Sequence, residues 1–179
     1  MIDLSVVVPI LDDDLGLREL LPELSGEFNE VVVIDGGDSE LAKQLADLCG
    51  AVYSRCSPSR GYQIAKGVEL ARSEVIWVLH VDAYNLSHPI SRLKEITESR
   101  DLIWGRFDVE MPRLRSVPFL MNMRSRLTKI CTGDQGMFFS RALIEKIGGF
   151  PSKSLMEDVE VSRRLKKEFP KEFVACRET

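Results

Sequence analysis

The sequence predicts an α/β fold with a central, mostly parallel sheet covered by helices. Short apolar runs rich in Val, Ile and Leu, at residues 4–8, 31–34 and 75–79, alternate with segments whose apolar residues repeat at helical spacing. The runs are almost free of polar residues, which is typical of strands buried on both faces of a parallel sheet. The 179 residues are enough for one domain rather than two.

Up to residue 98 the alternation is regular. Strands are expected at residues 4–8, 31–34 and 75–79, with a weaker strand at 51–53, and helices at residues 15–24, 41–48, 61–71 and 90–96. Ser87, with Pro89 two residues later, favours a helix start just before the last of these. Helices that follow strands in this way fit a parallel sheet.

Beyond residue 100 the pattern is less regular, and we expect mixed strand directions. In order, it predicts a strand at 102–109, an amphipathic helix at 117–130, a short strand at 137–139, helices at 143–147 and 157–168, and a strand at 173–176. Residues 154–157, Ser-Leu-Met-Glu, match a capping box for the last helix, with Asp158 in its first turn. Glu160 and Arg164 then form an ordinary pair on that helix.

Composition excludes several classes of protein. The net charge is −4, from 24 Lys+Arg and 28 Asp+Glu, so the overall field does not attract nucleic acid. The four cysteines, at 49, 56, 131 and 176, lack CxxC spacing and are expected to be free or buried thiols in a reducing compartment. No apolar run approaches the roughly 18 residues of a membrane-spanning helix.

Residues that directly follow the expected strands are the first candidates for a site, because ligands of open α/β sheets bind outside the carboxyl ends of the strands. Pro9 and Ile10 follow the first strand, and Asp35 and Gly36 follow the second. Asp35 could bind a base or a ribose where the glycines let the backbone approach closely. An Asx turn explains the same residues, and on this segment alone it is the favoured interpretation.

Asp82 follows the strand at 75–79, two residues after His80. A carboxylate there could bind Mg²⁺ or Mn²⁺, which need only one or two protein oxygens when a diphosphate supplies the others. An ordinary loop aspartate beside a packed histidine is an equally good interpretation. Arg60, with Lys66 in the helix that follows, could meet a phosphate, or both side chains could simply face solvent.

Two polar segments of the second half are also candidates. Residues 133–136, Gly-Asp-Gln-Gly, stand between apolar residues, as in an interrupted strand beside a site or in a simple hairpin turn. Asp158 lies close behind the apolar pair Leu155 and Met156, where a carboxylate could be desolvated into a general base. Helix capping explains Asp158 equally well.

In this order, these segments resemble glycosyltransferase family 2, whose members have the GT-A fold. The likeness is closest to its small bacterial subgroup of radical-SAM/selenodomain-associated transferases, and it runs from Leu4 to about Leu165. The segments that carry it are Val6-Val7-Val8-Pro9, Val31-Val32-Val33-Ile34-Asp35-Gly36-Gly37, Arg60-Gly61-Tyr62-Gln63, Leu79-His80-Val81-Asp82-Ala83, Gly133-Asp134-Gln135, Gly148-Gly149-Phe150-Pro151 and Leu155-Met156-Glu157-Asp158-Val159-Glu160. Each segment is weak alone, and seven in register are specific.

The resemblance implies one GT-A domain, a three-layer α/β/α sandwich with a nucleotide-binding half at about 1–100 and an acceptor-binding half at about 101–179. The donor would be a nucleotide-diphosphate sugar. Residues expected to bind its nucleotide are Pro9, Ile10, Asp35, Gly36, Arg60, Lys66 and His80. Asp82 would hold a divalent metal, Mg²⁺ or Mn²⁺, that bridges the diphosphate.

For the chemical step, the resemblance implies that Asp158 deprotonates an acceptor hydroxyl as it attacks and inverts the anomeric carbon. Glu157 is expected beside it in the catalytic site. Asp134 and Gln135 are expected to position the acceptor. A metal on the leaving diphosphate and a base on the opposite side are a sensible division of labour.

Three features depart from the family pattern. His80 stands at the first acid of the usual DxD motif, Asp12 and Asp13 replace the usual Asn-Glu, and relatives generally continue past Thr179, so the chain is either naturally short or truncated. A binding or regulatory module without turnover is therefore an alternative. A nucleotidyltransferase is disfavoured because no Gly-rich loop ending in Arg or Lys follows the first strand.

The apolar segment 117–121, followed by Arg124, Arg126 and Lys129, has two interpretations. It could press on a membrane surface and reach a lipid-linked acceptor. A helix with its apolar residues in the core and its basic residues in water is favoured, because one short helix is a marginal anchor. We therefore expect a cytoplasmic protein, with a peripheral position at the inner membrane face as the alternative.

Overall fold

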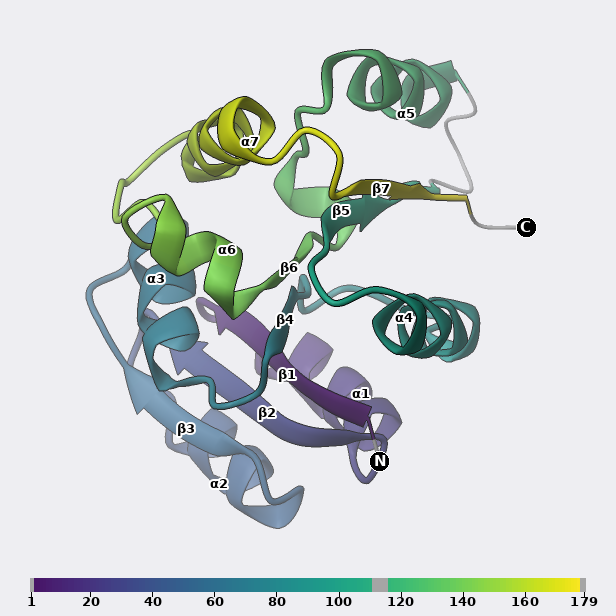
Figure 1. Cartoon of the computed structure of the whole chain (residues 1–179). Coiled ribbons are helices and arrows are strands. Elements are labelled where there is room, and N and C mark those ends of the chain that lie inside the picture. Colours follow the sequence, from purple (N-terminus) through teal and green to yellow (C-terminus); the bar gives the residue numbers. More distant parts are fainter. Residues whose placement is uncertain (1, 111–115, 178–179) are drawn as a thin grey trace.

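The computed structural model describes residues 2–110 and 116–177 (Figure 1). Its strands form one sheet in the order β3-β2-β1-β4-β6-β5-β7. Their bounds are β1 Ile2–Ile10, β2 Phe28–Asp35, β3 Val52–Arg55, β4 Val75–Val78, β5 Trp104–Phe107, β6 Phe138–Ser140 and β7 Phe173–Cys176. The first four are parallel to one another, β6 is antiparallel to β4 and β5, and β7 is parallel to β5. The expected α/β class and the mixed directions in the second half are confirmed.

Helices cover both faces of the sheet, as the three-layer prediction requires. Their bounds are α1 Asp14–Leu24, α2 Glu40–Leu48, α3 Arg60–Leu70, α4 Ser87–Ser99, α5 Ser116–Thr128, α6 Arg141–Lys146 and α7 Glu157–Glu168. One hydrophobic cluster joins the sheet to α1, α2 and α4, and a second joins the opposite face to α3, α6 and α7. A strand such as β1 serves both clusters: Val6 and Val8 face one, and Val7 faces the other.

Helix α7 begins without the predicted capping box. Met156, in the left-handed region with φ 61°, takes the N-cap position, and no side chain caps the helix. The Glu157 carboxylate is drawn instead towards Arg60, with Oε1 lying 3.6 Å from Nε. The predicted capping box is therefore wrong, because the acid that would complete it is buried against a cation.

The segment at 133–136 is neither an interrupted strand nor a hairpin turn. It forms a short 3-10 turn, η1 (Gly133–Gln135), closed by Gly136 with φ 52°. A capping box is found here, between Thr132 and Gln135, where the sequence did not predict one. The Gln135 side-chain oxygen accepts a hydrogen bond from the Thr132 backbone N–H at 3.1 Å, so this polar turn is rigidly closed.

Helix α5 is oriented differently from the favoured prediction. Its buried residues are Pro118, Asn122 and Ser125, whereas its large apolar side chains are exposed. The prediction of a core-facing apolar side is therefore wrong. The reason is a polar network beneath the helix, in which Asn122 and Ser125 bond to the chain around β5. No helix within 2–110 and 116–177 has the length and hydropathy needed to cross a bilayer.

Candidate active site

Loops from both halves of the sheet meet at the edge where the parallel strands end. The carboxyl ends of β1, β2, β4 and β5 lie there because these strands run in one direction. Strand β6 runs the other way, so its beginning lies beside the end of β4, and Val78 N–H donates to Met137 O at 2.7 Å. Turn η1, which comes just before β6, thereby joins the same edge.

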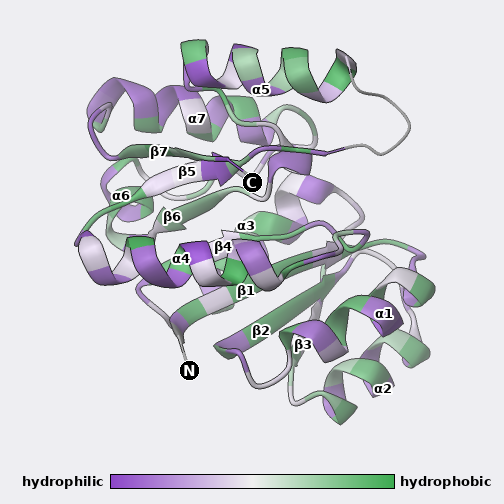
Figure 2. Ribbon diagram, turned by 90° about the vertical axis from the view of Figure 1, so that its right-hand side faces the viewer, coloured by the Kyte–Doolittle hydropathy of each residue, from purple (hydrophilic) through white to green (hydrophobic). Residues whose placement is uncertain are grey.

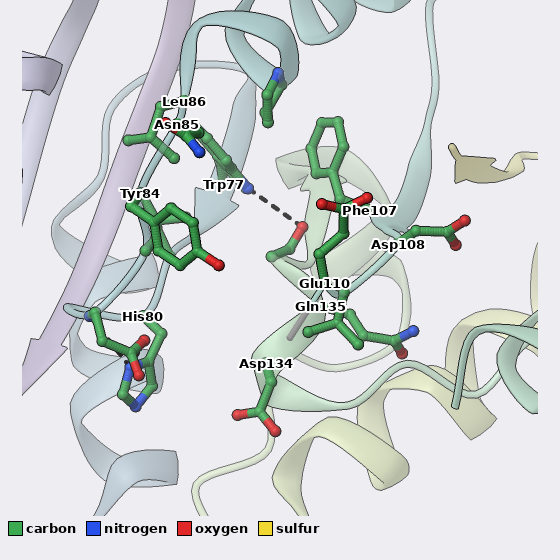
Figure 3. A pocket seen from close by; sticks show the side chains of 16 residues that line it. Trp77, His80, Tyr84, Asn85, Leu86, Phe107, Asp108, Glu110, Asp134 and Gln135 are labelled. Atoms are coloured by element: carbon green, nitrogen blue, oxygen red, sulfur yellow. Dashed lines mark hydrogen bonds and ion pairs between the residues drawn. The ribbon is translucent and has the colours of Figure 1, made fainter. Parts of the chain in front are cut away.

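The larger of two cavities at this edge measures about 470 Å³ (Figure 3). Its walls come from the segments that follow β4 and β5 and from η1. Trp77 and Phe107 supply apolar surface, and Trp77 Nε1–H donates to Gly136 O at 3.2 Å. Predicted residues that line this cavity are His80, Asp82, Asp134 and Gln135.

The smaller cavity, of about 250 Å³, lies beside the ends of β1 and β4 and the start of α3. Pro9, Ile10 and Arg60, all predicted to bind the nucleotide, are among the residues that line it. Gln63 closes its base, with Nε2–H donating to Ile10 O at 2.5 Å and to Ile34 O at 2.9 Å. His80 lines both cavities, so the two spaces adjoin one another at this histidine.

Asp35 makes the Asx turn that the sequence favoured. Its carboxylate accepts hydrogen bonds from Gly37 N–H (2.7 Å), Ser39 N–H (3.0 Å) and the Tyr53 hydroxyl (2.8 Å). Burial alone would raise the pKa of Asp35, but these bonds and the charge of Arg55 hold it below its ordinary value. Only 1% of Asp35 is exposed. Asp35 and Gly36 line neither cavity, and Gly36 packs against Gln63.

His80 and Asp82 form a hydrogen-bonded pair, with 2.5 Å between His80 Nδ1 and Asp82 Oδ1. The Asp82 side chain is 76% exposed and the His80 side chain 40%. An imidazole and a carboxylate are suitable ligands for Mn²⁺ when a diphosphate and water complete the shell. Within the described residues no group of three or more His, Cys, Asp or Glu forms a metal site, so this pair fits a metal only together with a phosphate ligand.

Arg60 links the smaller cavity to the start of α7. Its guanidinium packs over Gly133, where an added Cβ would come within 1.7 Å of Nη2. Asp158 Oδ2 accepts a hydrogen bond from Gly133 N–H at 2.8 Å, and Oδ1 accepts one from Val159 N–H at 2.6 Å. Glu157 is 5% exposed beside Arg60. Asp158 therefore lies against η1, which borders the larger cavity, and Glu157 lies against Arg60, and neither acid lines either cavity.

The predicted residues are only partly brought together. Of the three acids expected to share one cleft, Asp82 lines the larger cavity, Asp158 lies behind η1, and Asp35 is buried in its turn. Lys66 lines neither cavity, and its Nζ lies 3.8 Å from Glu69 Oε2. The expectation of a single cleft shared by Asp35, Asp82 and Asp158 is therefore wrong. The reason is that Asp35 uses its carboxylate to close a turn.

Several lining residues were not predicted from the sequence: Trp77, Tyr84, Phe107, Asp108 and Glu110. Asp108 pairs with Arg106, which is fully buried and also donates to Ser125 Oγ at 3.0 Å. A signal was available, because Arg106 and Asp108 are two positions apart at the end of β5, as His80 and Asp82 are after β4. It was missed because residues 102–109 were assigned to a strand and the end of that strand was not treated as a site.

Comparison with known proteins gives a clear answer for the fold. No protein-family model matches the sequence, and no curated protein matches it. The crystal structure of residues 1–349 of TarS from S. aureus is similar with a TM-score of 0.81 and 18% identity, over 99% of this chain and 59% of that crystallised chain. Glucosyl-3-phosphoglycerate synthase from Mycobacterium tuberculosis, in complex with Mn²⁺, UDP and glucosyl-3-phosphoglycerate, has a TM-score of 0.70 and 15% identity, over 97% and 69%.

These similarities define the class of fold. The chain has the GT-A fold, a Rossmann-like three-layer α/β/α sandwich shared with these glycosyltransferases. It spans 59% of the first TarS structure and 36% of a second, longer one. Because the sequence identities are only 15–18%, the similarity establishes the fold alone. The function has to be argued from the site.

Proposed function

We propose that this chain is a glycosyltransferase that moves a sugar from a nucleotide-diphosphate donor to a hydroxyl acceptor. The observation that carries the proposal is the pair of adjoining cavities that meet at His80, one beside a cation and one rich in acids. Transfer between two substrates needs two adjoining binding spaces with the reacting atoms between them. The subgroup named by the sequence resemblance belongs to the same proposal.

The smaller cavity suits the nucleotide part of the donor. Arg60 offers a planar guanidinium that can bind phosphate oxygens, and it stands at the first position of α3, where backbone N–H groups favour an anion. Ser59 Oγ is a buried polar atom without a hydrogen-bond partner among the described residues, and a bound diphosphate would satisfy it. Arg60 Nε also lacks a hydrogen bond, but it already faces the Glu157 carboxylate at 3.6 Å. In the mycobacterial synthase, the crystals hold UDP.

The larger cavity suits the sugar and the acceptor. The described residues that line it include the carboxylates of Asp82, Asp108, Glu110 and Asp134, and no Lys or Arg. Sugar hydroxyls donate hydrogen bonds to carboxylates, while Trp77 and Phe107 offer apolar surface for a ring face. These groups favour a hydroxyl-bearing ligand over an anionic one.

His80 and Asp82 would hold a divalent cation together with the diphosphate. When bound there, Mg²⁺ or Mn²⁺ would neutralise the charge that develops on the leaving diphosphate. The pair supplies one carboxylate and one imidazole, so we expect weak metal binding without nucleotide. The mycobacterial synthase has been crystallised with both Mn²⁺ and UDP.

Asp158 is the candidate base for an inverting attack. Two backbone N–H groups fix its carboxylate against η1, and η1 carries Asp134 and Gln135 into the larger cavity. Glu157, buried beside Arg60, would position this loop relative to the donor. At an acceptor hydroxyl brought beside η1, Asp158 would accept the proton.

The direct test is a calorimetric titration of UDP with and without Mn²⁺, on the wild type and on Asp82→Asn. We expect Mn²⁺ to strengthen UDP binding at least about tenfold in the wild type and to have no effect in the variant. Asp101→Asn, an exposed acid remote from both cavities, is the matched control. Equal UDP affinity in all combinations would contradict the metal-assisted donor site.

A binding module without turnover is the second candidate. It is favoured by the engagement of both Asp158 oxygens in backbone hydrogen bonds, which leaves the base partly occupied. Screening nucleotide sugars by thermal shift with Mn²⁺ would identify the donor in either case, because a ligand at 100 times its Kd adds about 2.7 kcal/mol of stability. If the chain releases UDP from the nucleotide sugar found in this screen when a sugar acceptor is present, the hypothesis of a binding module without turnover is excluded.

A further inference from the structure

Helix α5 carries an exposed apolar stripe that no described part of the chain covers. Its members are 42–78% exposed, and they are Val117, Phe119, Leu120, Met123 and Leu127. Because successive helical residues are turned by about 100°, these five side chains occupy one side of the helix. The buried residues Pro118, Asn122 and Ser125 occupy the opposite side. Neither hydrophobic cluster of the sheet includes a residue of α5.

The orientation of α5 is fixed by its polar side. Asn122 bonds to both backbone groups of Val109 at 3.0 Å, and its Oδ1 accepts from Gln135 at 3.2 Å. Ser125 accepts from the buried Arg106. Turning the apolar stripe inward would leave Arg106 and the Val109 backbone without these partners, which is costly for buried polar groups. The stripe is therefore held outward by the wall of the larger cavity.

Helix α5 itself carries cations and no acid. It contains two arginines, and at 100° per residue Arg126 borders the stripe on one side, while Arg124 lies within its other side, between Leu120 and Val117. Arg124 is exposed, while Arg126 pairs with Asp108. Helix α7 lies at the same end of the molecule (Figures 1 and 2), and its Ser162 Oγ accepts a hydrogen bond at 3.0 Å from the N–H of Cys131, three residues after the end of α5. Its C-terminal half adds exposed Arg163, Lys166 and Lys167, against one acid, Glu168, which lies 3.4 Å from the Lys167 ammonium.

We propose that α5 is a membrane-surface helix that docks this protein on anionic lipid. An apolar stripe that carries the exposed Arg124, whose long side chain can reach the headgroups, is the chemistry that an interfacial helix needs. Docking would place the larger cavity about one helix diameter from the lipid, since the opposite side of α5 holds its wall. Where the proposed transfer holds, its acceptor would be a hydroxyl carried by a lipid.

The test is co-sedimentation of the whole chain with vesicles of equal parts phosphatidylglycerol and phosphatidylcholine, and with vesicles of phosphatidylcholine alone. We expect binding to the mixed vesicles that falls at least about tenfold in the double variant Phe119→Ser, Leu127→Ser. Arg124→Gln should weaken it about fivefold. The matched control is Leu15→Ser, Leu48→Ser, which removes two equally exposed leucines from α1 and α2 and should bind as the wild type does.

Three results would overturn the inference. The first is a wild type that does not bind the mixed vesicles, and the second is equal binding by the wild type and the Phe119, Leu127 double variant. The third is a wild-type dimer in sedimentation equilibrium that becomes a monomer in this variant, because a second copy would then cover the stripe. UDP titration of the same variants separates this from the donor site. If the double variant loses vesicle binding and keeps its UDP affinity, the result supports the membrane role of α5 and leaves the donor site unaffected. If the wild type does not bind UDP, the proposed function is contradicted, but the membrane result still stands.

Discussion

The two halves of the sheet build the candidate site by different rules. In the parallel half, β3-β2-β1-β4, the residues that line the cavities lie at the ends of strands, in the loops after them or at the start of α3, because the carboxyl ends of parallel strands lie at one edge. In the mixed half, β6-β5-β7, the antiparallel strand β6 brings its beginning to that edge, so η1 contributes residues that precede a strand. At this edge, candidate site residues therefore follow the parallel strands but precede the antiparallel strand β6.

The halves also differ in how they treat charge. In the first, buried polar residues such as Asp35 and Gln63 satisfy backbone groups and stabilise turns. In the second, Asp108 lines the larger cavity and pairs with the buried Arg106, which is tied to α5. Buried polar groups in the first half therefore bond mainly to the backbone, and those in the second form an ion pair, while Gln63 and Asp108 each also line a cavity.

The largest expected effect is on turnover in the second half. Asp158→Asn should lower kcat about 10²- to 10⁴-fold, the range for loss of a general base, with UDP affinity unchanged. Initial rates of UDP release from the identified donor measure the first quantity, and titration measures the second. Glu160→Gln, two residues further along α7, is the control and should keep full activity. Full activity in Asp158→Asn would show that Asp158 is not the general base.

The next effect is on stability. Asp108→Ala leaves the fully buried Arg106 without its carboxylate, and we expect a loss of about 3 kcal/mol in the free energy of unfolding, measured in urea. The double variant Arg106→Met, Asp108→Leu should recover more than half of it. Asp101→Ala, an exposed acid just before β5, should cost less than about 0.5 kcal/mol. Equal losses in Asp108→Ala and Asp101→Ala would show that this pair does not stabilise the wall.

A smaller effect, dependent on pH, is expected in the first half. The pKa of Asp35 is lower in the folded chain than its ordinary value, so the unfolded state binds its proton first as the pH falls. Its contribution is complete above the ordinary aspartate pKa and is lost as the pH falls through the folded value. Asp35→Asn should cost about 1–3 kcal/mol at neutral pH and flatten the loss of stability in acid. Asp47→Asn, on the exposed side of α2, should leave that profile intact, and an unchanged profile in Asp35→Asn would contradict the account.

The smallest expected effect is at Gln63. Gln63→Leu removes the bonds to Ile10 O and Ile34 O, but Ile10 O keeps its bond from Gly36 N–H. We expect a loss of about 1 kcal/mol and weaker UDP binding, since Gln63 lines the smaller cavity. Gln44→Leu on the exposed face of α2 is the matched change and should alter neither quantity. Unchanged UDP affinity in Gln63→Leu would separate this cavity from the nucleotide.

The order and type of the elements were determined by the sequence alone. Two-sided burial makes a strand such as residues 31–34 a plain apolar run, and helical spacing marks the segments between strands, so local pattern was enough. Pro9, Ile10, Arg60, His80 and Asp82 were candidates because a parallel sheet fixes where strand ends lie, and they line the two cavities, while their roles in binding a ligand stay predictions.

Only the tertiary structure decided what each polar group bonds to. Glu157 lies against Arg60 instead of completing the predicted capping box, and α5 buries its polar side because Arg106 and Val109 need partners there. The physical reason is that hydrogen-bond partners far apart in the chain compete with local ones, and a buried polar group without a partner costs more than an exposed apolar side chain. This competition between distant and local partners leaves no periodic pattern of residues, so it cannot be predicted from the sequence in the way that strands and helices can.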